Sequence, residues 1–449
     1  MTSPNIIQGN PTKSFFIEMI TRDISIKDSI LDLLDNSIDG ANKINPNNYE
    51  GLIIDITINK NVFIVKDNCG GFDLETAQKY AFRFGRPDEA PTTEGSIGRF
   101  GVGMKRALFK IGQNFEVESK TTSDHFQIDV DSKKWKEQKT RVKNQEDEII
   151  EVDDWNFSYT IITEESKNLE QNGTYIRVFN LNKEVAAIFE ENSFLIELED
   201  DIERLLNFSL EKGIQITLNG KPLRKKGIVL FNSESQPYIV EKEIDGVRIR
   251  IAAGLSYVGE PKTSGWYIYC NDRLVLEADQ SHITLWGTTG IPKWHPDYVM
   301  FKGIIFFDSE DTLKLPLTTT KKGVDSTSEI FSKAKMYIRE AMIAVLAFLK
   351  EIRNLGNEAN DYRMLLGEQE DIVSVKDLKA IPIKQERSFT APILDYEKIS
   401  VKRSNVRISF EAPEKMVKYV KDYTAVKSNK ELGLYLFEYF LTMEDIENE

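Results

Sequence analysis

The sequence predicts an α+β protein with several domains, and three features support this prediction. Residues 25–43 repeat apolar side chains at helical spacing, residues 61–66 form a short β-rich segment before a Gly-Gly turn, and residues 328–355 form a longer amphipathic helix pattern. A chain of 449 residues corresponds to roughly three domains at about 150 residues each. We therefore expect helices packed on sheets.

Composition narrows the class of protein. The chain is 41% hydrophobic and 29% charged, which is typical of a globular protein with a large core. No apolar run approaches the ~20 residues of a membrane helix, and no secretory signal precedes the first domain. Two cysteines, Cys69 and Cys270, are too few for a disulfide framework, which fits a reducing compartment. With no membrane helix and no signal, we therefore expect a cytoplasmic protein that does not act on a membrane. The net charge of −14 argues against a generally basic surface but leaves room for a local basic groove.

The helix predicted at residues 25–43 carries the first candidate site. Asp32 and Asn36 are four residues apart and therefore share one helix face, which has almost no basic residue at i+4. An Asn is a poor helix former, but its amide oxygen beside a carboxylate suits Mg²⁺. A second carboxylate can orient or deprotonate a water molecule. A solvated acidic helix face is the competing interpretation of this stretch alone.

Two predicted strands carry the next candidates. The strand at 61–66 ends in Asp67, which is followed by Gly70 and Gly71. A carboxylate at such a strand end can accept a hydrogen bond from an exocyclic amine while a flat ring lies on the turn. Gly173 and Thr174 begin another predicted strand. Taken separately, both segments are equally compatible with a purely structural role.

A glycine-rich segment, with glycines at 95, 98, 101 and 103, precedes a helix predicted from Met104 to Gly112. Such a loop presents free N–H groups and the positive end of the helix dipole to a phosphate. It is not a Walker loop, because Met104 stands where Lys is required. It is not a dinucleotide fingerprint either, because Arg106 occupies the last glycine position.

Together and in this order, the four segments resemble the nucleotide site of the GHKL ATPases, the superfamily of gyrase B, ninety-kilodalton heat-shock chaperones, histidine kinases and MutL. Within it they look most similar to the MORC-like ATPases and their bacterial relatives. The resemblance implies a Bergerat-type sandwich of helices on a mixed sheet that binds ATP and Mg²⁺. The first motif of the family is matched by Asp32, Asn36, Asp39 and Gly40.

The resemblance also implies a role for each matching residue. Asn36 would bind Mg²⁺ and Asp32 would be the general base, while Asp67, assisted by Thr174, would bind the adenine amino group. The resemblance also implies that Gly71, in the turn after Asp67, contacts the nucleotide. In this family the glycine-rich segment forms a lid over the phosphates, with a lysine near them. The matching lid positions are Gly98, Gly101, Val102, Gly103, Met104 and Lys105.

Two residues depart from the family pattern. The family base is usually Glu, and Asp32 is one methylene shorter, so hydrolysis would be slow or would use a shifted water. Cys69 replaces the first glycine of the Asp-Asn-Gly-x-Gly turn, which should leave the Asp67 contact intact but constrain the turn.

The rest of the chain divides into predicted domains. We expect the ATPase domain over residues 1–195, a transducer-like α+β domain over 196–327 and a largely helical C-terminal region over 328–449. A hairpin signal at 214–228 and β-rich segments at 246–258 and 264–279 resemble the MutL-type and MORC-type transducer, with Arg273 in its strand-turn-Arg segment. Lys321, next to Lys322, matches the transducer lysine that reaches the γ-phosphate and would act in catalysis; a solvated basic loop is the alternative.

The predicted function is an Mg·ATP-dependent conformational clamp that forms a homodimer on ATP and acts with DNA or a protein effector, with bacterial defence as one context suggested by the resemblance. The N-terminal segment, with Ile6, Ile7, Phe15 and Phe16, would cross to the partner protomer unless it packs on its own domain. The alternative is an ATP-binding switch or adaptor that does not hydrolyse. A histidine kinase is disfavoured, because no histidine precedes the first motif.

Overall fold

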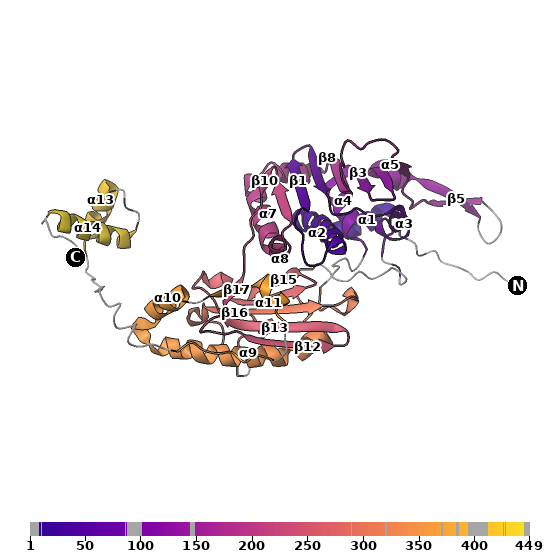
Figure 1. Cartoon of the computed structure of the whole chain (residues 1–449). Helices are drawn as coiled ribbons and strands as arrows, with labels where there is room; N and C mark the ends of the chain where they lie inside the picture. The colour runs from indigo at the N-terminus through magenta and orange to yellow at the C-terminus, as the bar shows by residue number, and fades with distance from the viewer. Residues whose placement is uncertain are drawn as a thin grey trace. The chain divides into compact units, whose positions relative to one another are not determined.

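The structure is a computed structural model that describes residues 9, 11–85, 87, 101–143, 149–288, 290–318, 321–369, 371–382, 386–393, 412–424, 426 and 428–443. Its contacts divide the chain into two compact units, residues 1–393 and 394–449, which are described separately. The first unit contains two large sheets, one following the other along the sequence (Figure 1).

The first sheet has eight strands in the order β10-β9-β1-β2-β8-β3-β4-β7, antiparallel except for the parallel pair β1 and β9. Along β1, Ile54, Ile56 and Ile58 are buried and the residues between them are exposed, as expected for a sheet covered on one face. The strands are β1 (Ile53–Asn59), β2 (Val62–Asp67), β3 (Gly112–Lys120), β4 (His125–Asp131), β7 (Tyr159–Ile161), β8 (Gly173–Leu181), β9 (Gln215–Leu218) and β10 (Lys221–Pro222).

Helices pack on the buried face of this sheet, with α2 lying against α4 (Figure 1). Helix α2 begins where the sequence predicts, because the Ser25 hydroxyl accepts a hydrogen bond from the Asp28 N–H at 3.1 Å and caps the first turn. Its apolar stripe, including Leu34 and Ile38, is buried in the core. The helices of this part are α1 (Lys13–Arg22), α2 (Ile26–Ile44), α3 (Leu74–Thr76), the π-helix η1 (Ala77–Ala81), α4 (Gly103–Ile111), α5 (Ser132–Glu137), α6 (Lys183–Ile188), α7 (Asn192–Leu205) and α8 (Asn207–Glu211).

The second sheet has five strands in the order β12-β13-β16-β14-β15 and is mixed, since β14 runs parallel to β16. Helix α9 (Glu329–Asn354) packs along β13 and β12 (Figure 1). Side chains from α8, β11, β17 and α11 cover apolar residues of the sheet. The strands are β12 (Tyr238–Ile244), β13 (Val247–Leu255), β14 (Gly265–Cys270), β15 (Arg273–Asp279) and β16 (Phe301–Asp308).

Smaller elements complete the described residues. Strands β5 (Lys139–Lys143) and β6 (Ile149–Asp153) form a separate hairpin, and β11 (Val229–Phe231) pairs with β17 (Ile372–Ser374). The other helices are α10 (Ala359–Gln369), α11 (Val375–Ala380) and, in the second unit, α13 (Glu414–Thr424) and α14 (Asn429–Met443); the short 3₁₀ helices are η2 (Pro261–Thr263), η3 (His282–Thr284), η4 (Pro296–Tyr298), η5 (Thr312–Lys314) and η6 (Gly356–Glu358). No helix among the described residues is both long and apolar enough to span a bilayer.

The predicted α+β class is confirmed: a large mixed sheet carries helices, as in a Bergerat-type ATPase domain, and the C-terminal region is helical. One expectation is wrong in detail. We expected the hairpin at 214–228 to open the second domain, but β9 pairs with β1 and β10 with β9 in the first sheet. Helix α9, which we assigned to the C-terminal region, packs on the second sheet. The predicted bounds of 1–195, 196–327 and 328–449 stay a prediction.

Candidate functional site

Helix α2 places the acidic and amide residues of the first motif along one stretch. Asp32 and Asp35 are buried, with 5% and 1% of their surface exposed, whereas Asn36 is exposed and Asp39 half-buried. The motif therefore has an interior part, formed by two carboxylates, and an accessible amide one turn after Asp32.

Asp32 is held by cations from two distant segments. Arg106, on α4, donates to Asp32 Oδ2 from Nε at 2.9 Å and from Nη2 at 2.6 Å. Lys321 Nζ lies 3.2 Å from the other carboxylate oxygen. The residue that the family resemblance names as general base is thus already paired on both oxygens.

Asp35, one turn along α2, pairs with two cations from the second half of the first unit. Lys321 Nζ donates to Asp35 Oδ2 at 2.8 Å, and Arg273 Nε lies 3.1 Å from Oδ1. Burial alone would raise the pKa of Asp35, but Arg273 and Lys321 outweigh it and hold the pKa below its usual value. Burial would likewise lower the pKa of Lys321, and Asp35 and Asp32 raise it instead, so the pairs stay ionised.

Asp67 occupies the end of β2 as the sequence predicts and has a different environment. Its carboxylate accepts hydrogen bonds from Ser37 Oγ at 2.7 Å, the Cys69 N–H at 2.9 Å and the Thr174 N–H at 3.2 Å. Thr174 lies opposite Asp67 because β2 and β8 pair in that register. Burial raises the pKa of Asp67 despite these three donors.

The turn after Asp67 explains two small residues of the motifs. A Cβ at Gly173 would lie 1.9 Å from the Asp67 carbonyl oxygen, so no other residue fits there. Gly70 and Gly71 have φ of +90° and +66°, whereas Cys69 has no positive φ and needs no glycine. The Cys69 N–H still donates to Asp67, so the substitution leaves that carboxylate in place.

The described part of the glycine-rich segment leads into α4. Gly98 lies outside the described residues; Gly101 has φ +64°, Val102 precedes the helix and Gly103 begins it. A Cβ at Gly103 would lie 3.3 Å from Asp32 Oδ2, so the start of α4 lies directly against α2. Met104 packs at the edge of the core.

The structure does not bring Lys105 to the carboxylates of α2. Its side chain is buried, with 2% exposed, and Nζ donates to the Ala81 carbonyl at 2.7 Å. Burial lowers the pKa of Lys105 to about 7. Arg106 takes the position beside Asp32 instead.

Sequence reasoning missed Asp35, Ser37 and Arg106 as site residues. Asp35 follows Asp32 at i+3, which was the one signal available, and Arg106 was noted only as a departure from a glycine pattern. Arg273 was matched to a family segment without a partner, and the structure pairs it with Asp35.

The accessible amide of Asn36 fits a magnesium ion that arrives with a nucleotide. Mg²⁺ commonly keeps waters and substrate phosphates and takes only one or two protein oxygens. Among the described residues, no group of three or more His, Cys, Asp or Glu is arranged to hold a metal on its own. A cation beside Asn36 would therefore depend on phosphate oxygens for most of its ligands.

Comparison with known proteins supports the prediction of an ATP-binding domain in the first part of the chain. Residues 24–165 match the model of the family described as "Histidine kinase-, DNA gyrase B-, and HSP90-like ATPase". The match supports the GHKL superfamily for this domain and, with it, ATP binding. Comparison of the sequence with curated proteins gives no match. The narrower likeness to MORC-like proteins stays a prediction.

Proposed function

We propose that this protein binds Mg·ATP between α2, the Asp67 turn and the start of α4, and hydrolyses it slowly in a conformational clamp. Asp32 is the general base and Lys321 the cation for the γ-phosphate. The function rests on one observation above the others. Lys321 is 286 residues from Asp35 in sequence, yet its Nζ lies within 3.2 Å of both Asp35 and Asp32.

This contact connects nucleotide state to the second sheet. A γ-phosphate offers Lys321 an alternative anionic partner, whereas ADP offers none at that position. A ligand shifts a conformational equilibrium only by its differential affinity for the two states. ATP would therefore act on the loop that carries Lys321 and on the sheet behind it, and ADP would act on them much less.

The other residues divide between binding and positioning. Asp67, with Ser37 and Thr174 fixing its carboxylate, accepts the adenine amino group. Asn36 holds Mg²⁺, which when bound supplies charge neutralisation of the phosphates. The N–H groups of Gly101 to Lys105, including the first turn of α4, face phosphate oxygens as helix N-termini do, and Gly71 keeps the turn open for the base. Arg106 must leave Asp32 before that carboxylate can take a proton from water, since donated hydrogen bonds stabilise its ionised form.

A non-hydrolysing switch is the second candidate, and one observation favours it. Asp32 is shorter than Glu and is bound by both Arg106 and Lys321. If these pairs persist with ATP bound, the protein holds the nucleotide without turning it over.

Dimerisation on ATP, a DNA or protein effector and a cytoplasmic location belong to the same proposal. The described part of the N-terminal segment gives mixed support. Phe15 is 61% exposed and available to a partner protomer, whereas Phe16 packs edge-on against Phe84 and Trp155 of its own domain.

Calorimetry and turnover, with and without DNA, test the proposal on the parent protein, Asn36→Ala and Asp32→Asn. We expect Asn36→Ala to lose Mg·ATP binding, and Asp32→Asn to keep it while turnover falls by roughly 10²–10⁴, the scale for losing a general base. Unchanged binding by Asn36→Ala would contradict the site, and unchanged turnover by Asp32→Asn would make Asp32 structural. Sedimentation of Asp32→Asn with ATP and with ADP, in the same preparations, checks the dimer; a monomer in both would contradict the clamp.

A further inference from the structure

Arg273 and Asp35 form a buried pair directly behind Lys321, and the proposed function gives neither of them a role. Only 1% of Asp35 and 4% of Arg273 are exposed. Asp35 contacts both Arg273 and Lys321, two cations that come from beyond the first sheet.

The backbone fixes where Arg273 can lie. It is the first residue of β15 and follows a two-residue turn formed by Asn271 and Asp272, which have φ of +45° and +67°. Two consecutive left-handed residues of this type make the tight turn that joins antiparallel strands, and Asn and Asp tolerate it better than other side chains. Asn271 also bonds to Ser309 through both its amide oxygen and its amide nitrogen, at 3.0 Å each, which secures the turn to the end of β16.

The guanidinium of Arg273 is under-satisfied in this arrangement. Its Nε lies 3.1 Å from Asp35 Oδ1, but the geometry is that of an ion pair without a hydrogen bond, and its buried Nη1 has no hydrogen-bond partner among the described residues. A buried unpaired donor is unfavourable.

Lys321 is also constrained by its backbone. It has φ +56°, in the left-handed region that a lysine rarely adopts, and its N–H donates to the Thr318 carbonyl at 3.0 Å. Leu317 and Val324 pair across the base of the loop. The loop therefore presents Lys321 from a narrow turn, and the carboxylates of α2 determine where its ammonium group rests.

Charged side chains crowd this face of α2. Arg106, Arg273 and Lys321 lie beside Asp32 and Asp35, and Asp39 on the same helix also acts on Lys321. These cations lie next to the N-terminus of α4, where an arriving phosphate can pair with them.

We propose that Asp35 is a positioning residue for Lys321: paired with Arg273, it holds the lysine at the face of α2 where the γ-phosphate arrives. Asp35 does not touch the reacting atoms and acts only through Lys321. When Lys321 turns to the phosphate, Asp35 keeps its ion pair with Arg273, so its buried carboxylate is not left unpaired. This inference rests on the proposed function, since it assumes that Lys321 binds the γ-phosphate.

The test is a double-mutant cycle on the full-length protein with Asp35→Asn, Lys321→Ala and the two combined. The ratio of ATP to ADP affinity is measured by calorimetry, together with kcat and KM for ATP. We expect Asp35→Asn to lower kcat by about 10- to 100-fold and to lower the ratio of ATP to ADP affinity, since Lys321 is no longer held where the γ-phosphate arrives. The double variant should match Lys321→Ala in kcat and in the affinity ratio, because residues that act as one unit are not additive.

Asp28→Asn is the matched control, because Asp28 lies on the same helix and pairs with the neighbouring Lys322 at 2.6 Å; its kcat should equal that of the parent. Arg273→Lys repeats the measurement with a cation retained and should also lower kcat. Asp35→Glu should have a higher kcat than Asp35→Asn, because it keeps a carboxylate that can hold Lys321. If Asp35 served only the packing of α2, the longer side chain would not restore kcat. Additive losses in the double variant, or a normal kcat and affinity ratio in Asp35→Asn, would overturn the inference.

The affinity ratio separates this inference from the proposed function. A parent protein that binds ATP without hydrolysing it defeats the proposed ATPase. The positioning role of Asp35 can still be tested in such a protein by calorimetry. If Asp35 positions Lys321, Asp35→Asn lowers the ratio of ATP to ADP affinity to the value found for Lys321→Ala. If that ratio stays at the parent value, the positioning role is wrong even though ATP binds.

Discussion

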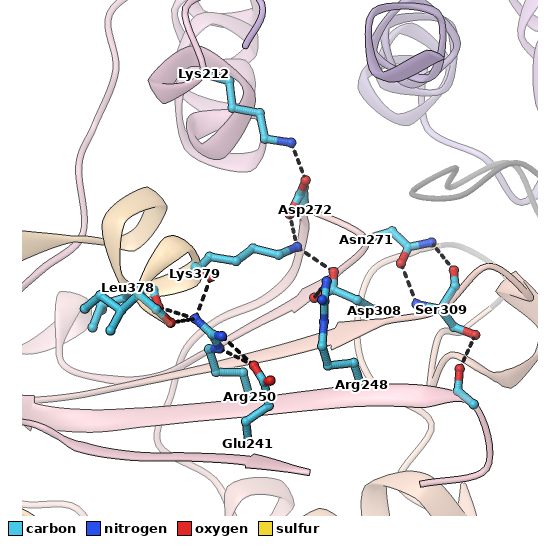
Figure 2. A network of polar contacts seen from close by, with 12 residues as sticks. Lys212, Glu241, Arg248, Arg250, Asn271, Asp272, Asp308, Ser309, Leu378 and Lys379 are labelled. Atoms are coloured by element: carbon cyan, nitrogen blue, oxygen red, sulfur yellow. Dashed lines mark hydrogen bonds and ion pairs between the residues drawn. The ribbon is translucent and has the colours of Figure 1, made fainter. Parts of the chain in front are cut away.

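Two ionic clusters join the first sheet and its helices to the second sheet, and they differ in how fully their members are hydrogen-bonded. The nucleotide-side cluster consists of Asp32, Asp35, Arg106, Arg273 and Lys321; the α11 cluster consists of Lys212, Asp272, Asp308 and Lys379 (Figure 2). They meet at the turn between β14 and β15, where Asp272 belongs to one and Arg273 to the other.

The α11 cluster is balanced and closed. Lys212 Nζ donates to Asp272 at 2.6 Å, and Lys379 pairs with both Asp272 and Asp308, at 2.5 Å from the latter (Figure 2). Arg250 caps the end of α11 by donating to the Leu378 carbonyl at 2.7 Å. Two lysines thus match two carboxylates, and the exposed Arg248, 3.8 Å from Asp308, adds little.

The nucleotide-side cluster is not closed. In the described part of the chain, Nη1 of Arg273 has no hydrogen-bond partner, and Lys321 lies on a left-handed backbone. The comparison indicates that the same kind of buried contact serves two purposes in this protein. We infer that the α11 cluster is a permanent joint and that the nucleotide-side cluster is completed by an anion.

The largest effect that we expect comes from breaking the balanced joint. Asp272→Ala leaves Lys212 and Lys379 without their shared carboxylate, and removing one member of a buried ion pair lowers the free energy of unfolding by about 3–5 kcal/mol. Urea unfolding measures the loss. Asp245→Ala is the control, since Asp245 pairs at the surface with Lys333 and should change stability by less than about 1 kcal/mol. If Asp272→Ala lowered the free energy of unfolding no more than Asp245→Ala, the α11 cluster would not stabilise the contact between the two sheets.

The nucleotide-side cluster should respond in the opposite way. In Lys321→Ala, Asp32 keeps Arg106 and Asp35 keeps Arg273, so the free energy of unfolding should fall by only about 1 kcal/mol. Turnover should fall by about 10²–10³, the scale for losing one preorganised group that stabilises the transition state. Lys322→Ala is the matched control, because that residue is next in sequence, half-exposed and paired only with Asp28 in the described part of the chain. The comparison would be contradicted if Lys321→Ala lost several kcal/mol of stability, as expected for Asp272→Ala, while its turnover stayed at the parent value.

The sequence predicted the parts of this site that depend on local pattern. Helix α2, the end of β2 at Asp67, the start of β8 at Gly173 and the start of α4 all follow from periodicity, capping and glycine positions within a few residues. The fold class followed as well, because the helix and strand periods are local properties.

The pairings between distant segments could not be predicted in this way. Arg273 and Asp35 are far apart in sequence, and β9 pairs with β1 across more than a hundred residues, so neither contact leaves a local signal. Lys105 and Arg106 show the limit most clearly. They are adjacent on α4, and only the packed structure decides that Lys105 is buried near Phe84 while Arg106 reaches Asp32.

Lys105 gives the smallest effect and sharpens the comparison, because it is a buried cation that belongs to neither cluster. Neighbouring carboxylates outweigh burial and raise the pKa of Lys321 and of Lys379, whereas Lys105 has a carbonyl oxygen and burial lowers its pKa to about 7. An unfolded lysine has a pKa of about 10.4. Between these values the unfolded chain binds more protons than the folded one, so this residue makes stability rise with pH across that window.

We therefore expect Lys105→Met to be more stable than the parent at pH 7, since the unfavourable burial of a charge is removed, with the difference shrinking towards pH 10. Urea unfolding at several pH values measures the difference in stability. Lys110→Met controls for the loss of a lysine from α4, since Lys110 lies on the same helix and donates to the Thr21 carbonyl at 2.9 Å. A difference that does not change with pH would contradict the buried charge. ATP affinity, measured on the same variant, should stay within about threefold if Lys105 remains inside; a large loss would instead support the phosphate contact implied by the family resemblance, and would mean that α4 turns Lys105 outward when the nucleotide binds.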